Sequence, residues 1–356
     1  MSRAALARHP GAGLRVVYIM GASRCGSTAL SSLLGAQQAG ICAGELNQLP
    51  RSGWLQDDYC SCGRRCTQCP FWNAVRDEWH LLCPDADVHD YVRLQSKFER
   101  LRSWPRLRLA AMWKSTAFRA YLRLTGGLLG AISSVSGRSI IVDSSKGAVR
   151  PWALACLPGV DVRVIHLVRD VRATAWSQAK SYERDPRNGV PTEKPSRAVW
   201  KSSLEWVLAN MLAEQCTPSG RRLLIRYEDL VRQPEQALNG LQAGLELDLQ
   251  AVISAVDSGE AVPVGHQIAG NRLRMQGSVR LRADRDWITA MPIRDRETCW
   301  RMAGWLARRY GYSRNRLELD NDDDGSAGIR SRQRGWPNAN QFELVSSEQG
   351  VPCSNG

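Results

Sequence analysis

The chain has 356 residues, enough for one large α/β domain with an insertion or for two small domains. Hydrophobic residues make up 43% of it, which is sufficient for a globular core, and no apolar run is long enough to span a membrane. The net charge of +13 suits a polyanionic ligand. Because no RRM, zinc-finger or helix-turn-helix pattern accompanies that charge, a nucleic-acid partner is not expected.

A strand, a tight loop and a helix are predicted near the N-terminus. Residues 1–13 should form a flexible lead-in without the apolar segment of a secretion signal. The β-branched and aromatic run 16–19 predicts a buried strand, and leucines at helical spacing follow the loop: Leu30, Leu33 and Leu34. Such a unit aims backbone N–H groups and a helix N-terminus at an anion.

The loop has the glycine spacing of a P-loop but not its lysine. Gly21 and Gly26 are five positions apart, Ser27 stands where the lysine belongs, and the cation comes earlier as Arg24. This disfavours ATP or GTP hydrolysis. An ordinary turn without a ligand is the alternative, and the clustering of Arg, Gly, Ser and Thr argues against it.

The run Arg24-Cys25-Gly26-Ser27-Thr28 resembles the 5′-phosphosulfate loop of sulfotransferases that use 3′-phosphoadenosine 5′-phosphosulfate (PAPS). It is similar to the arginine variant of tyrosylprotein and carbohydrate sulfotransferases. The resemblance implies a P-loop-like three-layer α/β domain over residues 14–313, with a central parallel sheet flanked by helices. It also implies that these five residues bind the donor. Golgi relatives carry a membrane anchor that is not evident here, so a cytoplasmic location is expected.

A second short strand is predicted over residues 41–46, and it ends at a carboxylate, Glu45. In tyrosylprotein sulfotransferases a Gly-Glu pair at this place supplies the general base, so the resemblance implies that role for Glu45. The alternative is a surface glutamate on a loop.

Residues 51–83 form a cysteine-rich segment that looks like a family insertion. Cys60, Cys62, Cys66 and Cys69 have the spacing C-x-C-x3-C-x2-C, which is compatible with zinc, with disulfides or with free buried thiols. No histidine lies within the segment's cluster, so a structural role without metal is favoured over zinc. The next segment, residues 85–136, is predicted to be helical.

The strand predicted at 139–143 ends in Asp143-Ser-Ser-Lys146. A hydrophobic run followed by Asp is also typical of a Walker B strand, which keeps a P-loop kinase open as an alternative. The resemblance implies instead that Lys146 lies near the sulfuryl group and stabilises charge on the leaving phosphate oxygen. A surface lysine is the remaining interpretation.

The strand predicted at 162–168 leads into Arg169, with Ser177 eight residues later. The resemblance implies that both residues hold the 3′-phosphate of the nucleotide. Eight helical residues rise ~12 Å, so the two side chains converge only if the loop folds back. His166, inside the strand pattern, is expected to be a core residue rather than a catalyst.

The later segments supply three more expected nucleotide contacts. A mobile loop over 181–197 should lie beside the acceptor cleft, and a helix follows over 198–216. In the strand and acidic turn at 222–230, the resemblance implies that Tyr227 reaches the adenine; a core tyrosine is the alternative. Asn271 and Arg274 match the family's late basic loop over the 3′-phosphate, although a solvated basic loop has the same composition. Residues 314–356 should be a disordered tail.

Together these features predict a PAPS-dependent sulfotransferase that moves the sulfuryl group to a hydroxyl of a small-molecule or carbohydrate acceptor and leaves 3′-phosphoadenosine 5′-phosphate (PAP). The chemistry requires no metal. The alternatives are a P-loop-type kinase of a small metabolite and a non-catalytic nucleotide-binding protein. The sequence identifies neither the acceptor nor the oligomeric state, and it shows no membrane anchor.

Overall fold

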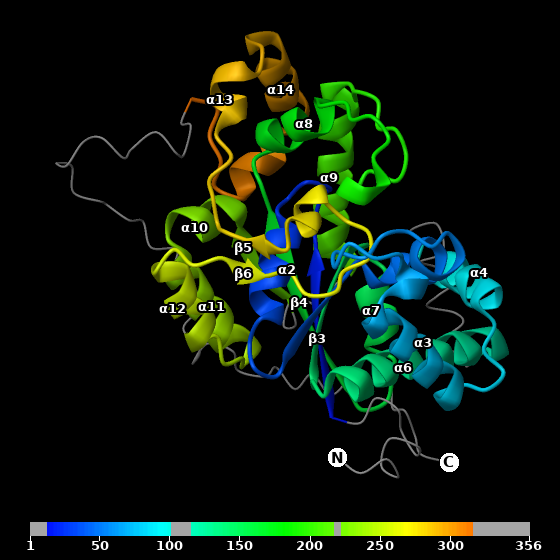
Figure 1. Cartoon of the computed structure of the whole chain (residues 1–356). Helices are drawn as coiled ribbons and strands as arrows, with labels where there is room; N and C mark the ends of the chain where they lie inside the picture. The colour runs from blue at the N-terminus through cyan, green and yellow to red at the C-terminus, as the bar shows by residue number, and fades with distance from the viewer. Residues whose placement is uncertain (1–12, 101–114, 217–221, 316–356) are drawn as a thin grey trace, which may run out of the picture.

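The computed structural model describes residues 13–100, 115–216 and 222–315, and these contain a central sheet of parallel strands (Figure 1). The strand order is β2-β3-β1-β4-β5. The strands are β1 (Leu14–Met20), β2 (Gly40–Gly44), β3 (Ile140–Lys146), β4 (Val160–Val168) and β5 (Arg222–Arg226). The predicted α/β class with a central parallel sheet is confirmed.

Helices cover both faces of this sheet (Figure 1). Those in the first half are α2 (Ser27–Gly35), α3 (Pro70–Leu82), α4 (Val88–Phe98), α6 (Thr116–Ser136), α7 (Arg150–Leu154) and α8 (Val171–Ala179). Those in the second half are α9 (Val199–Cys216), α10 (Tyr227–Arg232), α11 (Pro234–Leu245), α12 (Gln250–Asp257), α13 (Asp286–Ala290) and α14 (Ile293–Arg309). Short helical turns and a two-stranded ribbon complete the described chain: η1 (Leu46–Gln48), η2 (Leu49–Leu55), η3 (Cys66–Gln68), η5 (Pro186–Asn188), η7 (Arg272–Gln276), β6 (Val262–Pro263) and β7 (Ser278–Val279).

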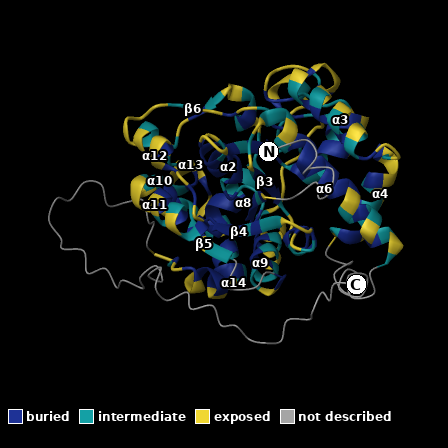
Figure 2. Cartoon of the chain, turned by 90° about the horizontal axis from the view of Figure 1, so that it is seen from below, coloured by how far each residue is buried: buried dark blue, intermediate teal, exposed yellow. Residues whose placement is uncertain are grey.

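The alternation of side chains along β1 explains the three layers. Val16 and Tyr18 pack into one hydrophobic cluster with α3, α4 and α6, whereas Val17 and Ile19 pack into another with α2, α11 and α12. Both faces of β1 are therefore buried, as expected for a parallel sheet covered by helices. Figure 2 shows the buried residues gathered at the sheet and the exposed ones on the outer helices.

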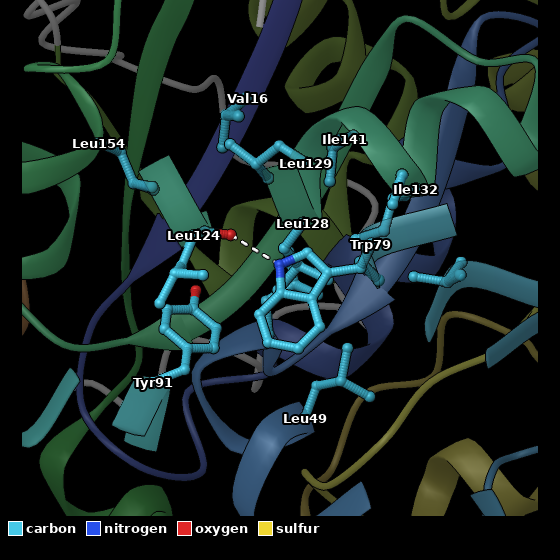
Figure 3. Packing of buried hydrophobic residues seen from close by; sticks show 14 of the residues in the cluster. Val16, Leu49, Trp79, Tyr91, Leu124, Leu128, Leu129, Ile132, Ile141 and Leu154 are labelled. Atoms are coloured by element: carbon cyan, nitrogen blue, oxygen red, sulfur yellow. Dashed lines mark hydrogen bonds between the residues drawn. The ribbon is translucent and has the colours of Figure 1, made fainter. Parts of the chain in front are cut away.

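Trp79 anchors the helices on the first face. Its indole N–H donates a hydrogen bond to the carbonyl oxygen of Leu124 over 3.0 Å, and its ring lies among residues of α6 and the sheet (Figure 3). A buried indole needs such a partner, so this bond fixes α3 against α6.

Several element boundaries differ from the sequence prediction. The strand predicted at 41–46 ends at Gly44, and the strand predicted at 139–143 runs on to Lys146. The expected strand at 222–230 ends at Arg226, and Tyr227 begins helix α10 with Glu228 and Asp229 in its first turn. Acidic side chains at a helix N-terminus are favourable, which explains the early end of the strand. The helical segment 85–136 contains α4 and α6, and residues 101–114 between them lie outside the described chain.

The predicted ends of the domain fall almost wholly outside the described residues. This applies to the lead-in 1–13 and to the tail 314–356. In the described part of the chain, no helix combines the length and apolar character needed to cross a membrane.

Candidate active site

A cleft of about 950 Å³ opens where the parallel strands end. Its walls come from the segments that follow β1, β2, β4 and β5, from the last residue of β3, and from the later loops. Ligands of open parallel sheets bind at this edge. Every residue expected to act in the site lines the cleft except Cys25: Arg24, Gly26, Ser27, Thr28, Glu45, Lys146, Arg169, Ser177, Tyr227, Asn271 and Arg274.

The loop after β1 is closely packed against Tyr227. Gly26 precedes α2 with φ of 98°, and a Cβ atom placed on it would meet the Tyr227 ring at 2.4 Å. Only glycine permits both this φ and this contact. Helix α2 has no acidic residue in its first turn and no side-chain cap. Neither feature therefore offsets the partial positive charge of its N-terminus, which faces the cleft.

Cys25 is placed apart from the other loop residues. Its side chain is only 1% exposed and belongs to the hydrophobic cluster between the sheet, α2 and α11. Burial raises the pKa of this thiol above its ordinary value. The residue therefore contributes packing beneath the loop rather than a side chain in the cleft.

Arg24 and Arg169 are joined directly. The Arg169 guanidinium donates a hydrogen bond from Nη1 to the backbone oxygen of Arg24 over 3.1 Å. The Arg24 pKa is lowered, first by burial and then partly by the nearby cations Arg272 and Arg169, although Tyr182 and Glu45 oppose this. The loop after β1 and the loop after β4 thus present two cations on one surface, where an anion would relieve their mutual repulsion.

Arg169 has an anionic partner that the sequence analysis missed. Its Nη2 donates to Asp284 Oδ2 over 2.9 Å, and its guanidinium lies 4.6 Å from the centre of the Tyr227 ring. Burial lowers the Arg169 pKa, but Tyr227 and Asp284 outweigh it, and the net shift is upward. Ser177, in α8, lines the same cleft.

Lys146 and Glu45 meet at the adjacent strand ends. Lys146 Nζ donates to Glu45 Oε1, and both side chains are mostly buried, with exposed fractions of 18% and 17%. Lys146 ends β3 with φ of 66°, a left-handed conformation that is uncommon for a lysine. The strained backbone delivers a cation next to the expected base.

A buried ionic network lies behind this pair. Asp143 is fully buried and accepts hydrogen bonds from Ser145 and from Arg150 Nε, the latter over 2.9 Å. Arg150 also pairs with Glu99, which accepts from the hydroxyl of Tyr121 over 2.8 Å. Because breaking one member of such a network leaves an unpaired buried charge, the end of β3 is held firmly.

The late loop, residues 264–285 between β6 and α13, closes the cleft from the other side. Asn271 caps η7 by accepting from the Leu273 N–H over 3.2 Å. Arg274 is buried, donates from Nη1 to the Tyr59 carbonyl oxygen over 3.0 Å, and has an Nε without a partner among the described residues. The Arg274 pKa is lowered, chiefly by burial.

The loop at 181–197, expected beside the cleft, does line it and adds a cation that the sequence analysis did not single out. Tyr182 and Lys194 are bridged across this loop, and Lys194 faces the cleft. The Lys194 pKa is lowered by burial and next by Arg24. No local sequence pattern distinguishes this lysine, because its position depends on how the loop folds back.

The cysteine-rich segment is grouped differently from the sequence expectation. Cys60, Cys62 and Cys69 lie together, and the fourth member is His266 from the late loop rather than Cys66. The structure therefore brings together a set other than the four cysteines considered from their spacing, because the local pattern could not include a histidine about 200 residues away.

Comparison with known proteins gives one family match. Residues 153–251, which include β4, Arg169, Ser177 and Tyr227, match the model of the sulfotransferase family. A search of curated proteins found no matching sequence.

Solved structures give distant likenesses. The sulfotransferase domain of the Synechococcus PCC 7002 olefin synthase is 17% identical with a TM-score of 0.44, over 84% of this chain and 95% of that one. The sulfotransferase domain from the curacin biosynthetic pathway is 16% identical with a TM-score of 0.43, over 83% and 98%. Sulfotransferase STF9 from Mycobacterium avium is 14% identical with a TM-score of 0.43, over 87% and 81%.

Proposed function

The chain carries a sulfotransferase-family segment at residues 153–251, and from this premise we propose that it transfers a sulfuryl group from PAPS to a hydroxyl of a small-molecule or carbohydrate acceptor. The observation that carries the proposal is the contact between Arg169 Nη1 and the Arg24 backbone oxygen at 3.1 Å. It joins two cationic loops into one surface with room for a nucleotide that bears phosphate at both ends.

Each end of the donor has its own set of residues in this proposal. Arg24, Ser27, Thr28, the Gly26 loop and the N-terminus of α2 hold the 5′-phosphosulfate. Arg169 and Ser177 hold the 3′-phosphate, Asn271 and Arg274 cover it, and Tyr227 lies against the adenine. All of these residues line the same cleft.

The transfer proceeds in line between the two oxygens. The oxygen of the acceptor hydroxyl bonds to sulfur while Glu45 accepts the hydroxyl proton. The bond between sulfur and the phosphate oxygen breaks on the opposite side. Lys146, bound to Glu45 in the structure, stabilises the charge that develops on the departing phosphate oxygen. Side-chain cations supply the charge stabilisation, so this proposal includes no metal in the reaction.

The kinase alternative receives less support. A Walker B aspartate must reach a magnesium ion at the phosphates. Asp143, its candidate here, is fully buried, pairs with Arg150 and does not line the cleft. A transfer reaction that required ATP and magnesium would favour the kinase. We propose a sulfotransferase, and we expect it to be cytoplasmic.

The deciding experiment is calorimetry with PAP and AMP, followed by a labelled-sulfate transfer screen. PAP should bind at least about tenfold more tightly than AMP, since a charge-assisted phosphate contact contributes about 1.5–3 kcal/mol. Arg24→Ala and Arg169→Ala should each weaken PAP binding, whereas Arg197→Ala, an exposed cleft arginine paired with Glu205, should not. Equal affinity for PAP and AMP would contradict the donor assignment.

A further inference from the structure

Four potential metal ligands from two distant segments converge beside the cleft. The Sγ atoms of Cys60, Cys62 and Cys69 and a ring nitrogen of His266 all lie within 4.8 Å of one another. We propose that these four residues bind one structural Zn²⁺ ion that ties the cysteine-rich segment to the late loop. This site is separate from the proposed transfer chemistry and does not depend on it.

The spacing of the ligand atoms fits a tetrahedral zinc ion. Zn–S bonds of about 2.3 Å and Zn–N bonds of about 2.0–2.1 Å place neighbouring sulfurs about 3.8 Å apart, and sulfur and nitrogen about 3.6 Å apart. The sulfurs of Cys62 and Cys69 are 3.7 Å apart, and His266 Nδ1 lies 3.7 Å from Cys60 Sγ and 3.3 Å from Cys69 Sγ.

The ligand set is also chemically complete. Three thiolates and one imidazole make the Cys₃His set of closed structural zinc sites, which leaves no position for a substrate. On binding, the thiols release their protons to solvent and the histidine stays neutral. The site therefore holds structure together and performs no chemistry.

Cys66 is not part of the proposed ligand set, although it lies between Cys62 and Cys69 in the sequence. It is buried beneath η2, where a Cβ atom placed on Gly53 would meet its sulfur at 3.0 Å. Cys69 immediately precedes α3, so its sulfur lies at the N-terminal end of a helix, which favours a thiolate.

Hydrogen bonds around the ligands hold the two segments in register. The Ser61 hydroxyl donates to the Gly265 carbonyl oxygen over 2.6 Å and accepts from the Gln267 N–H over 2.7 Å. The His266 ring stacks on Phe71 with centroids 5.2 Å apart. Outer contacts of this kind orient metal ligands before the ion binds.

Both segments that carry the proposed zinc ligands also contact residues of the cleft. Arg274 donates to the carbonyl oxygen of Tyr59, the residue before Cys60. On the same loop, a Cβ atom placed on Gly270 would lie 3.4 Å from Glu45 Oε1. Figure 1 shows the late loop, in yellow, passing beside the blue cysteine-rich segment. Zinc would thus fix the wall of the cleft that carries Asn271 and Arg274.

The test measures metal content and metal affinity in the full-length protein. Zinc is quantified by plasma mass spectrometry in the wild type and in Cys62→Ser, His266→Ala and Cys66→Ala. Cys62 is exposed, so its substitution removes little packing. We expect about one zinc ion per wild-type chain, full occupancy in Cys66→Ala, and binding weakened more than about 100-fold in the two ligand variants, beyond the effect of outer-shell changes.

Two further measurements use only the wild type, so they do not depend on how the variants fold. Co²⁺ added to the metal-free protein should give the intense visible absorption of a tetrahedral thiolate site. Chelation should speed amide hydrogen exchange over residues 264–276 while α11 stays unchanged. A wild-type chain that contains no zinc and gives no such cobalt spectrum would overturn the site. Zinc retained in His266→Ala but lost in Cys66→Ala would overturn the ligand set in favour of four cysteines.

Discussion

Lys146 donates a hydrogen bond to the carboxylate of Glu45, although the two residues are 101 positions apart in the chain. They meet because β2 and β3 are parallel neighbours that end at the same edge of the sheet. Lys146 Nζ also lies 3.3 Å from the Ser144 carbonyl oxygen, so its ammonium has two anchors. A proton acceptor and a cation for the leaving group therefore stand together before any substrate enters.

Replacing Glu45 with glutamine should separate transfer from donor binding. Glutamine keeps the shape and a hydrogen bond to Lys146 but cannot accept the proton of the acceptor. Since general base catalysis contributes about 10²–10⁴-fold, we expect sulfuryl transfer to fall by at least about 100-fold. PAP affinity, measured by calorimetry, should change by less than about threefold, because in this proposal Glu45 acts on the acceptor hydroxyl and holds neither phosphate of the nucleotide.

Glu193→Gln is the matched control, since Glu193 also lines the cleft but is exposed. It should retain the transfer rate of the wild type. If Glu45→Gln transferred sulfate as fast as this control, Glu45 would not be the base. If the wild type bound PAP but transferred no sulfuryl group to any acceptor, a non-catalytic nucleotide-binding protein would be favoured.

Asp284 should compete with the nucleotide for Arg169. Its Oδ2 accepts from Arg169 Nη2 over 2.9 Å, and its side chain is 35% exposed at the cleft. A bound 3′-phosphate would need the same guanidinium and would be repelled by the carboxylate. We expect Asp284→Asn to tighten PAP binding by about 3–10-fold, as for the loss of one partly screened charge.

The control for this prediction is Asp286→Asn in α13. Asp286 pairs with exposed Lys180, and its own side chain is 71% exposed, so its replacement should leave PAP affinity unchanged. The PAP affinities of both variants and of the wild type are compared by calorimetry at one ionic strength. Weaker binding in Asp284→Asn would show that the carboxylate orients Arg169 for the phosphate rather than competing with it.

Local sequence pattern located the five strands and placed cationic residues near their carboxyl ends. Arg24, Lys146 and Arg169 each stand at or just after a hydrophobic run, and parallel strands bring such ends to one edge. The predicted parallel sheet is confirmed for this reason. The apolar residues 223–225 predict a strand that reaches Tyr227 before an acidic turn, whereas Tyr227 itself begins α10 and the acidic pair lies in the first turn of that helix.

Contacts between distant segments left no trace in the local pattern. His266 lies 197 positions from Cys69, and Asp284 lies 115 positions from Arg169. Each partner has an ordinary neighbourhood in sequence, and only the path of the late loop brings it to the site. Pairings of this kind depend on tertiary packing, so the spacing of the four cysteines could not indicate that His266 lies beside three of them.

Gly21 should be required for the stability of the sheet edge. A Cβ atom placed on it would lie 2.3 Å from the Leu167 carbonyl oxygen, a backbone atom of β4 that cannot move aside. We expect Gly21→Ala to lower the free energy of unfolding by about 2–3 kcal/mol more than a glycine replacement without a clash. Urea denaturation followed by circular dichroism provides the measurement.

Gly137→Ala supplies that reference. Gly137 caps the C-terminal end of α6 with φ of 66°, and a Cβ atom there would meet nothing within 4 Å. Its replacement should destabilise the protein by about 1 kcal/mol through backbone strain alone. Equal effects of the two substitutions would mean that the chain after β1 shifts away from Leu167 without penalty.

His166 should make the fold sensitive to mild acid. It is fully buried in β4, its Nε2 is hydrogen-bonded to Asn210 Oδ1 over 2.8 Å, and its Nδ1 has no partner among the described residues. The ring edge packs against Tyr310, and the nearby charges are Arg222 and Glu214. Burial, with Arg222 in support, lowers the His166 pKa from 6.5 to about 4.

A lowered pKa in the folded state means that the unfolded chain takes up the proton first as pH falls. His166 therefore stabilises the fold fully above about pH 6.5, and this contribution is lost as the pH falls towards about 4, by on the order of 3 kcal/mol. The free energy of unfolding, measured with urea at several pH values between 6.5 and 4, should fall with a slope that reports this loss. It should be shallower in His166→Gln, which cannot take up a proton, and unchanged in His89→Gln, where the histidine is exposed. An equal slope in His166→Gln and the wild type would mean that carboxylates alone cause the acid sensitivity.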